Sequence, residues 1–172
     1  MQSLENHQRY LDQDDAKKRE VNVIITGVKE PAEDAARDND LETVTEILRA
    51  TGCDVVPAKV RRLGRRNEDE TRNRPLLVVT DSAAPRKKIL EKKSALKNLA
   101  DNRFRSIYIK PDEPVAVRIE WKRLRDALKK EKEAPTNQGV EIKLDYKTRK
   151  LLRDGVVIDQ FKSPFLKRGP NL

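Results

Sequence analysis

The stretch VNVIITGV, residues 21–28, is a short apolar run rich in β-branched side chains that ends at Gly27. Such a run is typical of a central strand of a sheet. Working outward, apolar residues recur at helical spacing after Asn39, which has the character of an N-cap, and the pattern ends at Gly52. We therefore expect a buried strand followed by a helix of about three turns.

Four more elements complete this part of the chain. The sequence predicts strands near residues 59–63, over residues 75–80 and over residues 105–110, with a helix capped by Ser82 before the last of them. The order strand, helix, strand, strand, helix, strand is that of the ferredoxin-like arrangement. Both helices then cover one face of the sheet, and in RNA-recognition modules the other face is the binding platform.

A different pattern follows Pro111. Asp112 is the expected cap of a helix whose packing face contains Trp121 and Leu124, GVEIKLDY (residues 139–146) alternates like a half-buried strand, and Asp154-Gly155 signals a tight turn before another strand. The predicted fold class is therefore α+β. The predicted domains are a short helical leader (1–20), a domain like the RNA-recognition motif (21–111), a small α+β C-terminal domain (112–162) and a tail (163–172).

Charge is distributed unevenly along the chain. The net charge is +9, but residues 1–58 hold 7 Lys and Arg against 13 Asp and Glu, whereas residues 59–172 hold 31 against 16. A basic region of this kind favours nucleic acid as a partner, with an anionic membrane surface second. The alternative is that Lys-rich helices only keep the protein in solution.

Catalysis is not indicated. The chain has one histidine, His7, and one cysteine, Cys53, and it contains no phosphate-binding glycine loop or metal-binding motif. We expect no enzyme activity, no cofactor and no metal, with a nuclease built on scattered carboxylates as an alternative. The polar N-terminus and short apolar runs predict an intracellular protein without a signal peptide or membrane span.

Two basic segments are candidate nucleic-acid contacts. The first is KVRRLGRR (residues 59–66), because guanidinium groups bind phosphates and stack on bases; its alternative is an edge strand protected by charge. The second is a stripe along the predicted helix, with Glu120, Asp126 and Glu131 as alternative partners for its cations. The candidate residues of the two segments are Lys59, Arg61, Arg62, Arg65, Arg66, Arg118, Lys122, Arg125, Lys129 and Lys132.

Tyr108 and Lys110 are the third candidate contact. Tyr108 alternates with Ile107 and Ile109 and so should lie on the open face of the sheet, where it either stacks on a base or only covers the sheet. The two predicted central strands contain no aromatic residue, unlike those of a typical RNA-recognition motif. We therefore expect binding to depend on charge, with low sequence specificity.

Five segments of the chain follow one another in a characteristic order: KKREVNVIITGVKEP, AKVRRLGRR, RPLLVVTD with the Lys-rich helix after it, IYIKPDEP and AVRIEWKRLRDALK. Together they resemble the RNA-binding protein encoded by the first open reading frame of LINE-type retrotransposons. The resemblance covers roughly residues 11–160. It implies an atypical RNA-recognition motif and a C-terminal domain that clasp single-stranded RNA, form a ribonucleoprotein and act as a nucleic-acid chaperone. It also implies RNA contacts by the arginines of the segment 59–66 and by Arg118.

Two features depart from that family. Vertebrate members trimerise through a long coiled coil, of which only LENHQRYL could be a remnant, so a homo-oligomer is expected only if a coiled coil lies upstream. The family's Tyr-Pro pair in the C-terminal domain is absent, and Tyr146 receives no RNA-binding role. The expected partner is single-stranded RNA, with single-stranded DNA as an alternative, in a cytoplasmic ribonucleoprotein or also in the nucleus. The competing hypothesis is a ferredoxin-like module that binds a partner protein.

Overall fold

The computed structural model describes residues 2–30, 37–66, 73–99 and 101–165. The chain forms two compact units: one is Lys18–Asp112, and the other joins Met1–Lys17 to Glu113–Leu172. Both helices and antiparallel sheets are present, which confirms the α+β class. The predicted leader (1–20) is divided between the two units, and the predicted tail (163–172) lies outside the described residues from position 166 onward.

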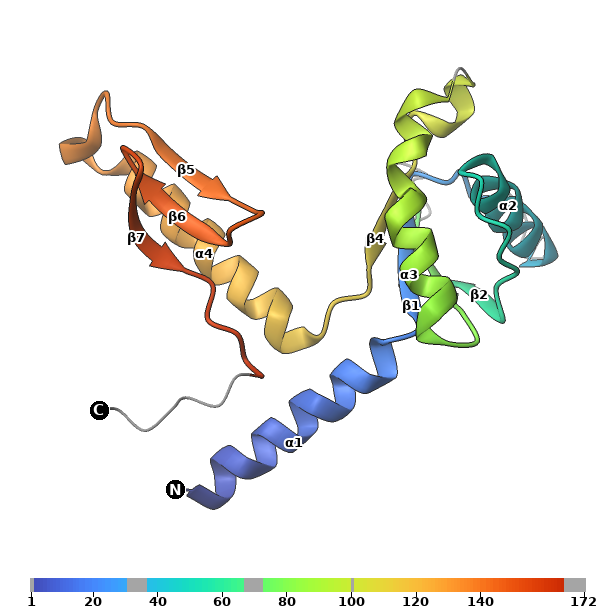
Figure 1. The fold of residues 1–172 in the computed structure, drawn as a ribbon, viewed down its shortest axis with the longest axis horizontal. Helices are drawn as coiled ribbons and strands as arrows, with labels where there is room; N and C mark the ends of the chain where they lie inside the picture. The colour runs from blue at the N-terminus through green and yellow to red at the C-terminus, as the bar shows by residue number, and fades with distance from the viewer. Residues whose placement is uncertain (1, 31–36, 67–72, 100, 166–172) are drawn as a thin grey trace. The chain divides into compact units, whose positions relative to one another are not determined.

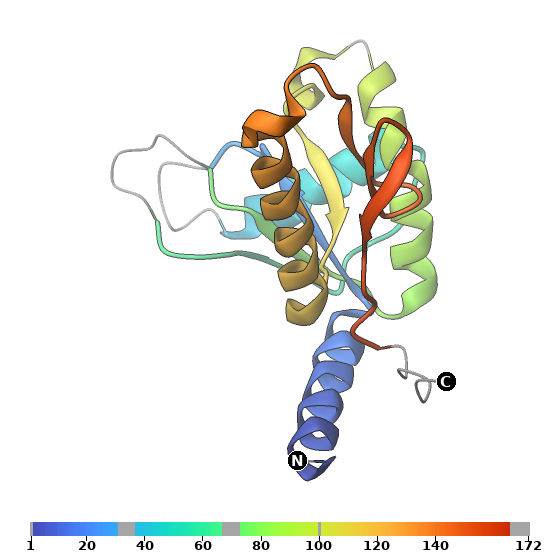
Figure 2. The same cartoon turned by 90° about the vertical axis from the view of Figure 1, so that its left-hand side faces the viewer.

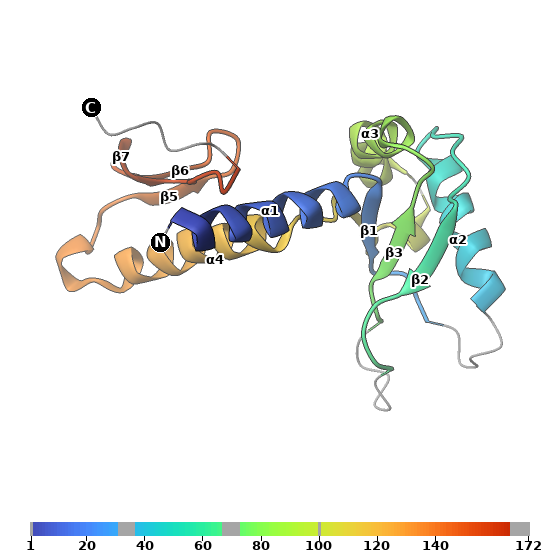
Figure 3. The same cartoon turned by 90° about the horizontal axis from the view of Figure 1, so that it is seen from below.

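The unit Lys18–Asp112 is built on a four-stranded antiparallel sheet in the order β2-β3-β1-β4. Figure 3 shows β1, β3 and β2 side by side in this unit, with α2 beside them. Along the chain the elements follow the predicted order of strand, helix, strand, strand, helix, strand. Their bounds are β1 Asn22–Thr26, α2 Arg37–Ala50, β2 Lys59–Arg62, β3 Leu76–Val79, α3 Ala83–Lys92 and β4 Tyr108–Pro111.

The core of this unit lies between one face of the sheet and the two helices. Alternate residues of β1 and β3 point into it, because successive side chains of a strand lie on opposite faces. These strand residues are joined by the buried side chains of α2 and α3. The core includes Val23, Ile25, Val44, Ile47, Leu48, Leu76, Val78 and Ile89, each no more than 1% exposed.

Two predicted helix caps are wrong. The helix α2 begins at Arg37, so Asn39 lies within its first turn. The N-cap of α4 (Val115–Glu133) is Pro114 and not Asp112. Asp112 is buried instead, and its carboxylate accepts hydrogen bonds from Asn22 at 3.1 Å and from Arg19 at 2.8 Å. These bonds fix the end of β4 beside the start of β1.

The strand predicted over residues 105–110 begins later in the structure than expected. Residues 93–104 contain two 3-10 helices, η2 (Lys93–Asn98) and η3 (Asn102–Phe104), and β4 begins only at Tyr108. Since β4 pairs only with β1 in the described sheet, its other side is an edge.

The other unit packs a three-stranded antiparallel sheet against α4 (Figures 1 and 2). Leu124 of α4 is fully buried, and the half-buried Trp121 packs beside it, as the helical spacing predicted. Asp154 and Gly155 both have positive φ and form the predicted turn between the last two strands. The elements of this unit are α1 Gln2–Arg19 without its last two residues, α4, η4 Pro135–Asn137, β5 Ile142–Asp145, β6 Lys150–Arg153 and β7 Val156–Gln160.

Among the described residues, no helix combines the length and the apolar character needed to cross a membrane.

Candidate nucleic-acid interface

The sheet face opposite the helices, called here the outer sheet face, has an apolar centre between two basic edges. The register places Leu77 of β3 beside Ile24 of β1, and each is 7% exposed. Arg61 of β2 pairs with Leu77, and Lys110 of β4 pairs with Ile24. These four residues form one row across the sheet, about 14 Å from end to end, because neighbouring strands lie about 4.8 Å apart.

Two further exposed side chains border this row. Lys59 precedes Arg61 by two positions in β2, and Tyr108 precedes Lys110 by two positions in β4, so each lies on the same face as its neighbour. Tyr108 is 60% exposed, which confirms the orientation predicted from the alternation. The strands β1 to β4 contain no acidic residue. The outer sheet face therefore carries uncompensated positive charge within its strands.

Arg62, one of the predicted RNA contacts, is bound within the protein instead. Its guanidinium group points to the helix side of the sheet, where the side chain is only 6% exposed and pairs with the Asp40 carboxylate of α2. Its remaining N–H groups donate to the carbonyl oxygens of Val28, Lys29 and Arg74 at 2.9–3.0 Å. With every donor engaged, Arg62 holds β2 to α2 and cannot serve as a ligand contact.

Arg74 forms a second internal ion pair and also links the two ends of the loop between β2 and β3. Arg74 donates to the Glu30 carboxylate and also to the carbonyl oxygen of Gly64 at 3.3 Å. The hydrogen bond from Arg74 lowers the pKa of Glu30. Arg65, next to Gly64, is exposed, whereas Arg66 is partly buried.

The predicted basic stripe on α4 is exposed. All of its side chains face solvent, and Lys129 makes only a long i,i+4 contact of 3.8 Å with Glu133. Two of the acidic residues suggested as its partners are engaged elsewhere, Glu120 with Arg123 and Glu131 with Arg153. In the residues that the structure describes, no ion pair is made by Arg118, Lys122 or Arg125.

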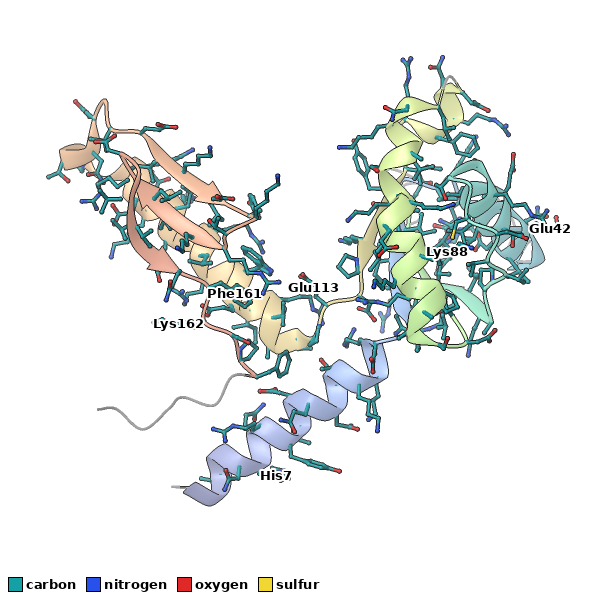
Figure 4. The ribbon with its side chains drawn as sticks, viewed as in Figure 1. His7, Glu42, Lys88, Glu113, Phe161 and Lys162 are labelled. Atoms are coloured by element: carbon teal, nitrogen blue, oxygen red, sulfur yellow. The ribbon has the colours of Figure 1, made fainter. Side chains whose placement is uncertain are left out.

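Arg123 organises the C-terminal unit, and no pattern in the sequence indicated this role. It donates to Glu120 of its own helix and to Asp159 of β7, and these bonds hold the pKa of both carboxyls below their ordinary values. Glu120 also accepts from the backbone N–H of Lys162 at 2.8 Å. Phe161, labelled with Lys162 in Figure 4, packs on Trp121 with ring centroids 4.9 Å apart. Trp121 is therefore a packing residue, as expected.

In the described parts of the chain, no cluster of His, Cys, Asp and Glu side chains is arranged to hold a metal ion. No protein-family model matches the chain, and no curated protein sequence matches it significantly.

Proposed function

We propose that this protein binds single-stranded RNA through the outer sheet face, with low sequence specificity and without a catalytic step. The observation that carries the proposal is the row of residues with a basic group at each end and two apolar side chains between them. A single strand laid across the sheet would place its phosphates near Arg61 and Lys110. Its bases would then lie between these two cations, above Ile24 and Leu77, whose side chains are apolar but only 7% exposed.

Tyr108 supplies the aromatic surface that β1 and β3 lack. A base stacked on an aromatic side chain contributes about 1–3 kcal/mol, and stacking tolerates every base because each has a π face. With one exposed aromatic residue on this face, most of the binding energy comes from charge. This balance supports a sequence-tolerant protein.

The fold supports assigning the unit Lys18–Asp112 to the ferredoxin-like class of RNA-recognition modules, because the strand and helix order is the expected one and both helices pack on one face. The exposed stripe on α4 gives the other unit a basic surface of its own. Together with the sequence resemblance, these features lead us to propose a protein of LINE retrotransposon origin that forms a ribonucleoprotein and acts as a nucleic-acid chaperone.

The test is a titration of labelled single-stranded RNA and of a duplex of equal length, followed by fluorescence anisotropy at several salt concentrations. We expect tighter binding of the single strand and a linear fall of log K with log salt. Replacing Arg61 and Lys110 by alanine should reduce the slope by about 1.4, since each phosphate contact to a single strand accounts for about 0.7.

The matched control replaces Arg103 and Lys87 by alanine. It removes the same charge from the same unit, but these two cations are already paired, Arg103 with Asp101 and Glu46 and Lys87 with Glu91. Its slope should stay close to that of the wild type. If both double variants change the slope equally, the RNA site is not the outer sheet face. If the wild type binds no RNA at low salt, the protein-interaction hypothesis takes the place of RNA binding.

A further inference from the structure

A cavity of about 710 Å³ lies beside the free edge of β4, within the unit Lys18–Asp112. Its walls come from η2, from the turn after η3 and from β4 itself. This volume lies within the range of about 300–1,000 Å³ that is usual for small-molecule sites. We call it the β4-edge pocket.

The lining of the β4-edge pocket is basic. Lys93 and Lys97 project from η2, Arg105 follows η3, and none of the lining residues is acidic. Within the described residues, none of these three cations has an ion pair. Arg103 nearby differs, because it is paired with Asp101. The β4-edge pocket therefore offers three unpaired cations to an anion.

Its floor is apolar. Leu96, Phe104, Ile107 and Ile109 contribute to the lining, and each is less than 10% exposed. A phosphate or sulfate ion would use the cations and leave the small exposed part of these apolar side chains uncovered. A nucleotide uses both, because its phosphate is anionic and its base has a flat apolar face.

The edge of β4 adds backbone hydrogen-bonding groups. The N–H of Asp112 donates to the carbonyl oxygen of Asn22, so the residues of β4 that bond to β1 are Lys110 and Tyr108. By the same alternation, the N–H and C=O of Ile109 point away from β1, toward the side on which the pocket lies. They provide one donor and one acceptor for the polar edge of a base or for a ribose hydroxyl.

Tyr108 joins the β4-edge pocket to the outer sheet face, because its side chain belongs to that face and also lines the pocket. We propose that the β4-edge pocket binds one nucleotide of the RNA strand that crosses the sheet, with its phosphate on Lys93, Lys97 and Arg105. This inference rests on the proposed function and adds to it a second contact site, beyond the face of the sheet. The RNA strand would turn over the edge of β4 at Tyr108.

The first test measures the salt dependence of RNA binding for Lys93→Ala plus Lys97→Ala. If these lysines contact one or two phosphates, the slope of log K against log salt falls by about 0.7–1.4. The control, Lys87→Ala plus Lys88→Ala, removes the same charge from α3 outside the pocket and should change the slope by less than half as much. Equal thermal midpoints for the two double variants show that folding is not the cause.

The second test uses adenosine 5′-monophosphate as the probe and follows the methyl signals of the isoleucines by NMR. We expect the signals of Ile107 and Ile109 to shift, and the shifts to be lost in Lys93→Ala plus Lys97→Ala. If only the methyl signal of Ile24 shifts, the nucleotide lies on the outer sheet face and the pocket inference is overturned, while the proposed function stands. If the Arg61→Ala plus Lys110→Ala variant also binds RNA like the wild type, both proposals fail.

Discussion

Arg61 and Arg62 are neighbours in β2, and we predict that Arg62→Ala lowers the stability of the fold, whereas Arg61→Ala weakens RNA binding. Loss of Arg62 leaves the Asp40 carboxylate, in a side chain only 12% exposed, without its cation. The carbonyl oxygens of Val28 and Arg74 lose their donors as well. Removing one partner of a buried ion pair costs about 3–5 kcal/mol, a large part of the roughly 5–15 kcal/mol that stabilises a typical protein.

Arg61 is exposed, and in the described residues its side chain makes no ion pair or hydrogen bond. Its replacement should change the free energy of unfolding by no more than about 0.5 kcal/mol. The same replacement removes one phosphate contact in the proposed complex, and it should lower the slope of log K against log salt by about 0.7. One arginine thus affects stability, and its neighbour affects binding.

The assay is urea unfolding followed by circular dichroism, with RNA anisotropy measured where each variant remains folded. Arg62→Lys is an informative control: it keeps the charge but cannot reproduce the planar fork of donors, so it should remain destabilised. The reasoning is refuted if Arg62→Ala unfolds at the same urea concentration as the wild type. It is equally refuted if Arg61→Ala loses more than about 2 kcal/mol.

Three further outcomes are expected. Gly27→Ala should unfold the unit Lys18–Asp112 or destabilise it severely, because φ is +87° and the new Cβ would overlap the backbone of Ser106. Gly64 has the same φ but open space around it, so Gly64→Ala should lower the free energy of unfolding by only about 1–2 kcal/mol in a thermal unfolding experiment. The carboxyls bound by Arg123 have lowered pKa values, so their stabilisation is present above the unfolded-state pKa and lost as the pH falls through the folded-state pKa. Urea unfolding followed by tryptophan fluorescence should therefore be less pH-dependent in Arg123→Met. Tyr108→Ala should weaken RNA binding by about 1–3 kcal/mol at constant salt slope, whereas Tyr108→Phe should bind like the wild type in the anisotropy titration.

Much of the fold follows from local patterns in the sequence. The apolar run around Ile24 predicted β1, and the spacing of Trp121 and Leu124 predicted the packing face of α4. Both predictions succeeded because the spacing of apolar residues along a short segment indicates which of its side chains are buried. The caps were harder to predict. Asp112 precedes a helix and has the chemistry of a cap, but its carboxylate is taken by Asn22, about ninety positions earlier in the chain.

The candidate site was predicted in the same partial way. The alternation in β4 placed Tyr108 on the outer sheet face correctly. The alternation in β2 also separates Arg61 from Arg62, but the sequence alone did not show that Asp40 lies opposite one of them. The basic pocket beside β4 depends on how η2 and η3 fold back, and the run of lysines near Lys93 gave no sign of it.

The most direct test of the central claim is methyl NMR of the full chain during titration with single-stranded RNA. Ile24 and Leu77 lie on the outer sheet face, whereas their neighbours Ile25 and Leu76 are fully buried in the core. RNA on the outer sheet face should shift the methyl signals of Ile24 and Leu77 and leave those of Ile25 and Leu76 much less affected. If RNA binds without shifting Ile24 and Leu77, its site lies elsewhere and the account is contradicted.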